Sequence, residues 1–262
     1  MRTFILAVAV LLTTVAGADA KVVGKAVKYK VGTAEYTGYL AYDDAVAGKR
    51  PGILVVHEWW GHDDYVEGRA RMLARLGYTA FAPDMYGTGK LAKHPKDATA
   101  FMTALFSSGE VMARMKAAAD VLTASNTVDP KRLGAIGYCM GGALVIDAAR
   151  NGMPNLKAVA SFHGSLAKHG DAKPGAVKAE MLIMYGGADP FIPKKDVDAF
   201  ENEMNNAGAR YTMVSYPGVV HSFTNPSATE KGKEFNMPLR YDPKAEEDSW
   251  RRMQILFAQE LK

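Results

Sequence analysis

Short apolar runs alternate with stretches of helical periodicity, and this alternation restricts the fold more than any other feature of the chain. The run at residues 51–57 is apolar almost throughout, as is typical of a strand buried on both faces of a parallel sheet. Further apolar runs lie at residues 78–82, 132–136, 156–162, 180–185 and 210–216. The sequence therefore predicts an α/β fold, with a doubly wound, mostly parallel sheet and helices on both faces.

The connecting segments complete this prediction. Val22–Lys30 and Tyr36–Tyr42 are rich in β-branched and aromatic residues around Gly32 and are expected to pair as a hairpin. Helical periodicity is found at residues 63–76, at about 96–125, and at 143–149, 194–207 and 243–261. No internal repeat or Pro/Ser-rich linker interrupts the pattern, so residues 21–262 are predicted to form one domain.

The first twenty residues are predicted to be a signal peptide. Met1 and Arg2 give a positive start, the stretch from Phe4 to Ala16 is almost entirely apolar, and residues 18–20 read Ala-Asp-Ala. This is the pattern of a cleavable export signal, here cut near Ala20. A membrane anchor is the alternative, although the apolar stretch is short for a span. We expect an exported protein, periplasmic or secreted, without a membrane-spanning segment.

Charge and motifs exclude several classes of partner. The chain has 32 Lys and Arg against 28 Asp and Glu, a net charge of +4, and these residues are interspersed. Such a balance gives no basic patch for nucleic acid. No glycine-rich phosphate loop follows a strand, so no cofactor is expected. His57 and His62 flank Glu58 without the spacing of a metal site, and no metal is expected.

The only cysteine of the chain lies in the segment Gly137-Tyr138-Cys139-Met140-Gly141-Gly142. An apolar run precedes this segment and a helical run follows it. Strand, tight glycine-rich turn and helix together form the context of a nucleophile elbow, usually with serine at its centre. A thiol at a helix N-terminus ionises more readily than a free one. A lone thiol can also be buried and inert or form a bridge between chains, but the glycine-rich turn favours chemistry.

Two further residues follow apolar runs where parallel strands end. Asp189 comes after residues 180–185, and His221 comes after residues 210–216. Taken alone, Asp189 could cap a helix and His221 could be a surface histidine. Their chain order with Cys139 is nucleophile, acid, histidine, which is the order of α/β-hydrolases. We therefore predict a catalytic triad in which His221 handles the proton of Cys139 and Asp189 orients the imidazole.

The same template predicts an oxyanion hole made of backbone N–H groups. One donor is expected from Met140, the residue after the nucleophile. The second is expected from the loop that follows the strand ending at His57, with Trp59 as the best candidate. A carbonyl oxygen held between these donors could accept negative charge when the thiolate attacks.

These residues resemble the dienelactone hydrolase family over nearly the whole of the predicted mature chain. The resemblance rests on His-Glu-Trp-Trp-Gly at 57–61, Ala-Pro-Asp-Met-Tyr-Gly at 82–87, the elbow at 137–142, Gly-Gly-Ala-Asp at 186–189 and Val-His-Ser-Phe at 220–223. It implies an α/β-hydrolase fold and a triad of Cys139, Asp189 and His221. It also implies a role for Glu58, which in the family contacts the resting thiol and swings away when substrate binds.

The chain departs from the family pattern at the residues that would bind the substrate carboxylate. Family members that cleave dienelactone have arginines that grip the substrate carboxylate, whereas residues 86–90 and 222–226 contain none. Lys90 could supply a charge but not the two-pronged geometry of arginine. Aromatic residues near strand ends suggest an apolar pocket instead, formed by Trp59, Trp60, Tyr86 and Phe191. Aromatic residues at such positions also occur as plain core packing.

The sequence thus predicts a hydrolase that cleaves carboxylic esters or lactones through a thioester on Cys139, with a small-molecule substrate. One alternative is a catalytically silent binding protein that keeps the fold. Another is a related hydrolase of amides, thioesters or sugar esters. His163, after the run at 156–162, is expected to be structural. Oligomeric state is not determined by these patterns.

Overall fold

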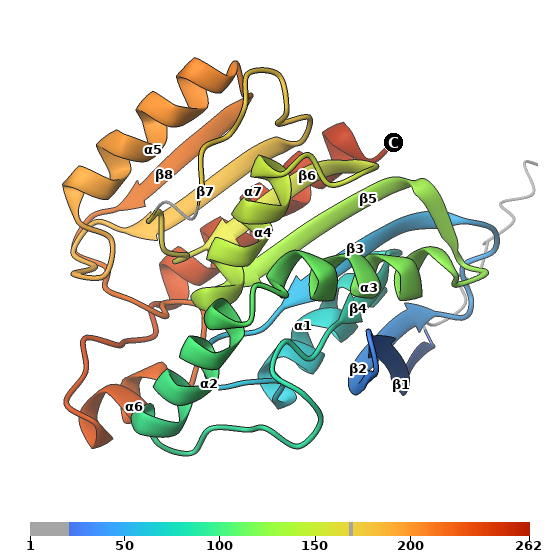
Figure 1. The fold of residues 1–262 in the computed structure, drawn as a ribbon, viewed down its shortest axis with the longest axis horizontal. Coiled ribbons are helices and arrows are strands. Elements are labelled where there is room, and N and C mark those ends of the chain that lie inside the picture. The colour runs from blue at the N-terminus through green and yellow to red at the C-terminus, as the bar shows by residue number, and fades with distance from the viewer. Residues whose placement is uncertain (1–20, 168–169) are drawn as a thin grey trace, which may run out of the picture.

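The computed structural model describes residues 21–167 and 170–262. Its strands form one eight-stranded sheet in the order β1-β2-β4-β3-β5-β6-β7-β8 (Figure 1). The strands are β1 (Val22–Val31), β2 (Ala34–Asp43), β3 (Arg50–Val56), β4 (Thr79–Ala82), β5 (Val128–Tyr138), β6 (Leu156–Phe162), β7 (Glu180–Gly186) and β8 (Tyr211–Tyr216). β1 and β2 are antiparallel, and β4 to β8 run parallel with β3. The predicted fold class is confirmed.

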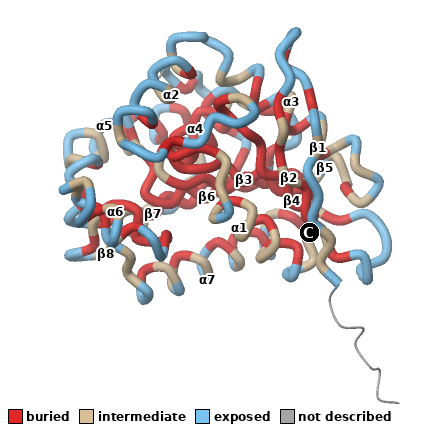
Figure 2. Tube along the Cα trace, turned by 90° about the horizontal axis from the view of Figure 1, so that it is seen from below, coloured by how far each residue is buried: buried red, intermediate tan, exposed pale blue. Residues whose placement is uncertain are grey.

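Helices cover both faces of the sheet. They are α1 (Asp64–Arg75), α2 (Pro95–Ser107), α3 (Val111–Thr123), α4 (Met140–Arg150), α5 (Lys194–Ala207), α6 (Ala228–Glu234) and α7 (Pro243–Glu260). Figure 2 shows the buried strands between α3 and α4 on one side and α1 and α7 on the other. Two hydrophobic clusters form accordingly, one on each face of the sheet. The central strands are buried on both faces, which explains their unbroken apolar sequences.

The structure differs from the prediction around residue 109. The helix expected at about 96–125 is two helices, α2 and α3. Gly109 separates them with a φ of +67°, which a right-handed helix cannot contain. The Ser108 hydroxyl accepts a hydrogen bond from the Glu110 N–H and stabilises this break. The short helix α6 was not predicted, because seven residues give too little periodicity to detect.

The chain topology brings the predicted site residues to one edge of the sheet. Cys139 follows β5, Asp189 follows β7 and His221 follows β8, all at the carboxyl ends of parallel strands. In open parallel sheets this edge is where ligands bind. Within the described ranges, none of the helices combines the length and apolar character that a membrane crossing needs. The predicted signal peptide lies outside the described residues.

Candidate active site

Cys139 occupies a strained turn between β5 and α4. Its backbone has φ +53° and ψ −117°, a conformation that costs a non-glycine residue about 1–3 kcal/mol. The turn places the partly exposed thiol at the N-terminus of α4, whose first residue is Met140. Helix N-termini stabilise negative charge, and the sulfur of Cys139 lies at such a position.

Glycines flank the turn because backbone approaches backbone on both sides. The Gly141 N–H donates to the His57 carbonyl oxygen at 3.1 Å, which ties α4 to the end of β3. A Cβ added at Gly142 would lie 2.7 Å from the Cα of Gly164, in the loop after β6. Since these neighbours are main chain, they cannot rotate away. The sequence pattern of the elbow follows from this crowding.

His221 and Asp189 form a buried pair. His221 Nδ1 lies 2.7 Å from Asp189 Oδ2, and both residues are at least 94% buried. The other carboxylate oxygen of Asp189 accepts the Phe191 N–H at 2.8 Å and so fixes the loop after β7. A carboxylate can only accept, so Nδ1 carries the proton and Nε2 is left for another partner. The helix-capping and surface interpretations of these two residues are therefore wrong.

The imidazole also interacts with Cys139. Burial disfavours the charged ring, but the neighbouring Cys139 thiolate and the Asp189 carboxylate outweigh it and raise the pKa of His221 to about 10. His221 and Cys139 line the same cavity. The three residues thus form one electrostatic unit, in which Cys139 and Asp189 both stabilise the protonated form of the ring.

Two backbone N–H groups of cavity-lining residues have no protein acceptor among the residues that the structure describes. They belong to Met140 and Trp59, the two positions predicted to donate to an oxyanion. Trp59 is held in place through its carbonyl oxygen, which accepts the Tyr86 hydroxyl at 3.0 Å. Both residues line the cavity that contains Cys139.

Glu58 is hydrogen-bonded to the segment that follows His221. Its two carboxylate oxygens accept hydrogen bonds from Ser222 Oγ at 2.9 Å and Asn225 Nδ2 at 2.6 Å. The side chain is buried, and burial raises the pKa of its carboxyl group although both hydrogen bonds lower it. In this conformation Glu58 fixes the segment that carries His221. The contact with the resting thiol that the resemblance implies is not among its hydrogen bonds.

The cavity beside Cys139 has a volume of about 320 Å³. Besides Cys139, His221 and Ser165, its walls are Trp59, Met102, Met140, Phe191, Met237 and Leu239. Of the four residues predicted to form an apolar pocket, Trp59 and Phe191 line it directly, and the Phe191 ring lies 5.1 Å from that of His221 between centroids.

Two predicted pocket residues lie outside this cavity. Trp60 is 2% exposed and packs into a separate cluster with Phe235, while Lys231 lies over its ring. Tyr86 is also buried, and its hydroxyl donates to the Trp59 carbonyl oxygen at 3.0 Å and lies 3.1 Å from the Met140 sulfur. The prediction that Trp60 and Tyr86 line the substrate pocket is wrong. Both side chains pack into hydrophobic clusters, and neither lines the cavity.

The chain matches known proteins over most of its length. The model of the dienelactone hydrolase family matches residues 36–261. The chain belongs to the dienelactone hydrolase family. A relative from Methylorubrum extorquens, with the provisional name carboxymethylenebutenolidase, is 30% identical over 227 residues, 82% of this chain and 74% of its own length. Protein usf of Aquifex pyrophilus is 29% identical over 87% of this chain and 94% of its own length.

A solved structure is similar along its whole length. It is a dienelactone hydrolase-like promiscuous phosphotriesterase from metagenomic libraries, 32% identical, with a TM-score of 0.84, and the match covers 92% of this chain and 99% of that one. Membership of the family makes the chain a hydrolase of the ester- and lactone-cleaving type. The expected α/β-hydrolase fold is shown by the same neighbours.

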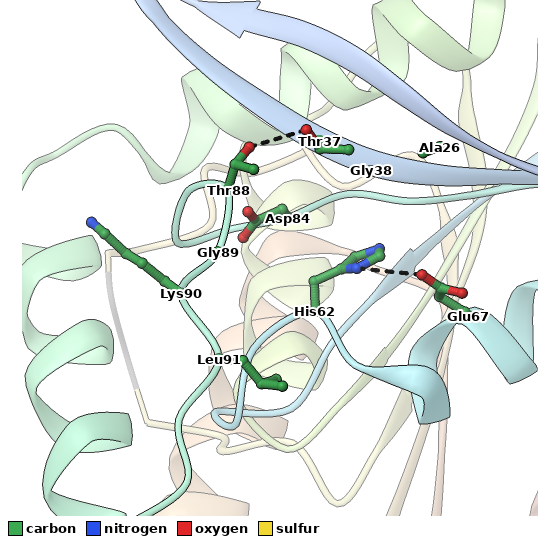
Figure 3. Close-up of a pocket in the computed structure, with 10 residues that line it drawn as sticks. All are labelled: Ala26, Thr37, Gly38, His62, Glu67, Asp84, Thr88, Gly89, Lys90 and Leu91. Atoms are coloured by element: carbon green, nitrogen blue, oxygen red, sulfur yellow. Dashed lines mark hydrogen bonds and ion pairs between the residues drawn. The ribbon is translucent and has the colours of Figure 1, made fainter.

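Lys90 does not replace the arginines that this member of the dienelactone hydrolase family lacks. It lines a different cavity, together with His62, Glu67 and Asp84 (Figure 3). Figure 3 shows its amine directed away from the other residues drawn. Neither Cys139 nor His221 lines that cavity. The suggestion that Lys90 supplies a charge to the substrate is therefore wrong.

Several neighbours of the site were not predicted from the sequence. Met102 in α2 and Met237 and Leu239 after α6 complete the cavity, and Ser222 and Asn225 hold Glu58. The only signal available was that Ser222 and Asn225 lie close to His221 in the chain. The cavity residues gave no signal, because they come from elements that meet Cys139 only in the fold.

His163 supports the nucleophile directly. Its Nδ1 accepts the Cys139 N–H at 3.1 Å, and this N–H also reaches the Phe162 carbonyl oxygen at 3.0 Å. Its Nε2 lies 2.8 Å from Thr224 Oγ1, so Nε2 carries the proton and donates to the hydroxyl. Burial, followed by the charge on His221, lowers the pKa of His163 well below its usual value. The ring is thus a neutral structural group, as expected.

Proposed function

We propose that the protein hydrolyses carboxylic esters or lactones with Cys139 as nucleophile, His221 as acid and base, and Asp189 as the group that orients His221. The observation that carries this proposal is the buried 2.7 Å contact of Asp189 with His221, which lines the same cavity as the strained Cys139. Nucleophile, base and orienting carboxylate at these positions are the parts that acyl transfer needs.

The reaction follows from the placement of these groups. The Cys139 thiolate attacks the carbonyl carbon, forming a C–S bond, while the protonated His221 faces the same cavity. When the tetrahedral intermediate collapses, the C–O bond to the leaving group breaks and His221 gives that oxygen its proton. A water molecule then attacks the thioester, and His221 takes the water proton. The carboxylic acid leaves and the thiolate returns.

Charge that develops on the carbonyl oxygen would be stabilised by the two unengaged N–H groups at Met140 and Trp59. Removing one such donor in other acyl-transfer enzymes costs roughly 100- to 1,000-fold in kcat. The Tyr86 hydroxyl contributes indirectly, because it holds the Trp59 carbonyl and the Met140 sulfur. Both donors are thus fixed before substrate arrives, which is what makes such a site effective.

Glu58 is proposed to have a second position. For its carboxylate to reach the thiol at rest, the hydrogen bonds to Ser222 and Asn225 must break, and the burial that raises its pKa makes the neutral acid easier to move. A carboxylate beside the sulfur would keep the thiol protonated and slow its oxidation. This protection would matter in an exported protein, the location that the N-terminal sequence favours.

A burst experiment tests the function. Purified protein mixed with excess p-nitrophenyl acetate should release about one equivalent of p-nitrophenol rapidly, and mass spectrometry should find the acetyl group on Cys139. Cys139→Ala and His221→Ala should lose the burst. A wild-type rate no higher than that of Cys139→Ala would favour a silent binding protein that keeps the fold. Rates on a panel of amides, thioesters and sugar esters would show whether the protein is instead a hydrolase of one of these substrate classes.

A further inference from the structure

We infer that the substrate presents an uncharged, apolar acyl group to this cavity, and that substrates with a free carboxylate are rejected. The inference rests on the proposed function and specifies its substrate class. It begins from the cavity wall, where six of the nine lining residues are apolar and three of those six are methionines (Met102, Met140, Met237). The remaining three are Cys139, His221 and Ser165.

No lysine or arginine lines the cavity among the described residues. Lys90 lies in the separate cavity of Figure 3. Lys231 lies 4.2 Å from the centroid of Trp60, which is itself outside the cavity wall. A carboxylate placed among the methionines would lose water without gaining a lysine or arginine partner, and this is costly in an apolar site.

The charge of the triad does not offset the cost of desolvating a substrate carboxylate. With Cys139 ionised and His221 protonated, the charges of Cys139, His221 and Asp189 sum to −1. With Cys139 and His221 both neutral, their charges again sum to zero, and the Asp189 carboxylate leaves the triad at −1. A second anion in the acyl chain would therefore be repelled in either state. An uncharged chain meets no such repulsion.

Apolar contacts favour an alkyl or aryl group instead. At roughly 30 Å³ for each non-hydrogen atom, a 320 Å³ cavity accommodates about ten atoms. Each methylene buried there should increase kcat/KM about fourfold until the space is filled. Methionine side chains are flexible, so the walls can adapt to linear and branched chains alike.

A matched pair of substrates tests the inference. The p-nitrophenyl esters of 4-methylpentanoic acid and of succinic acid have nearly the same shape, but the second ends in a carboxylate. Spontaneous hydrolysis is subtracted with Cys139→Ala as the blank. We expect kcat/KM on the order of a hundredfold higher for the neutral ester, and an increase along the acetate, butanoate and hexanoate series.

Met237 offers a variant that should weaken the preference for the neutral ester. Its side chain is half-buried at the cavity, so Met237→Arg can place a guanidinium there, and Met237→Gln is a neutral control of similar length. The arginine variant should narrow the ratio between the two esters at least about tenfold through pairing with the carboxylate, and the glutamine variant should not.

The outcomes separate the two proposals. Equal rates for the matched esters, or a faster succinate ester, would overturn the inference while leaving the ester hydrolase intact. If Met237→Arg does not fold, the ratio of kcat/KM for the two esters in the wild-type protein still tests the inference. If no ester is cleaved faster than by Cys139→Ala, the proposed function fails and the inference falls with it.

Discussion

Replacing Gly141 by alanine should damage stability and activity together, because this glycine is where α4 touches the end of β3. An added Cβ would lie 2.6 Å from the His57 carbonyl oxygen and closer still to that of Val56. The contact with the Val56 carbonyl oxygen would be 2.3 Å, and Cβ contacts in proteins stay above 3.0 Å, so α4 and β3 must separate by about 0.7 Å. The Gly141 N–H bond to His57 would lengthen with this movement.

The magnitude follows from these contacts. Overpacking costs about 1–3 kcal/mol, and the upper end applies because both obstacles are backbone. Alanine recovers at most about 1 kcal/mol of helix propensity. The net loss of about 2 kcal/mol corresponds to a fall in Tm of about 4–8 °C for a domain of this size. Because Met140 and Trp59 lie on the two sides of the contact, we also expect kcat/KM to fall at least about tenfold.

Gly68 provides the matched control. It lies within α1, and the nearest atom to an added Cβ is the Arg71 guanidinium at 4.0 Å. Gly68→Ala should therefore raise Tm slightly, since alanine favours helix by about 0.5–1 kcal/mol. Thermal unfolding followed by circular dichroism and ester hydrolysis would be measured on both variants. If Gly141→Ala has the same Tm and kcat/KM as the wild type, backbone crowding at Gly141 does not explain the glycine pattern of the elbow.

Three further predictions concern the groups around the sulfur. His221 keeps its proton above neutral pH because the Cys139 thiolate raises its pKa to about 10, so Cys139→Ala should lower the NMR titration midpoint of His221 by at least about one unit; an unchanged midpoint would contradict this pairing. Glu58→Gln should shift the pH profile of Cys139 alkylation to lower pH if the carboxylate guards the thiol, and an identical profile would exclude the guard. His163→Leu removes an acceptor of the Cys139 N–H and should lower kcat about tenfold with little change in KM. His163→Asn keeps an acceptor and tolerates the backbone φ of +44°, so it should recover part of that loss; equal kcat in both variants would show that the hydrogen bond does not matter.

The predictable parts of the fold are those that depend on residues close together in the sequence. The strand from residue 51 is buried on both faces, and an unbroken apolar run is the direct consequence of that burial. The elbow was readable because Gly137, Gly141 and Gly142 are required by backbone contacts within or next to the turn. The position of Asp189 and His221 at strand ends followed from the alternation of strands and helices.

The break at Gly109 and the helix α6 show the limit of this approach. One glycine in a long helical pattern can be accommodated or can end the helix, and the pattern does not distinguish the two. The structure ends α2 there, and Met102 of this helix then lines the cavity. The position of α6 likewise decides where Met237 and Leu239 lie, although neither belongs to any motif.

The sequence by itself determined the sheet, the elbow and the order of Cys139, Asp189 and His221, because each depends on residues near one another in the chain. Only the tertiary structure decided that Trp59 faces the cavity while Trp60, its neighbour, packs away from it. It also decided that both oxygens of Glu58 are taken by residues more than 160 positions away. The direction of a side chain in a loop depends on which distant elements pack against it, and periodicity carries no information about them.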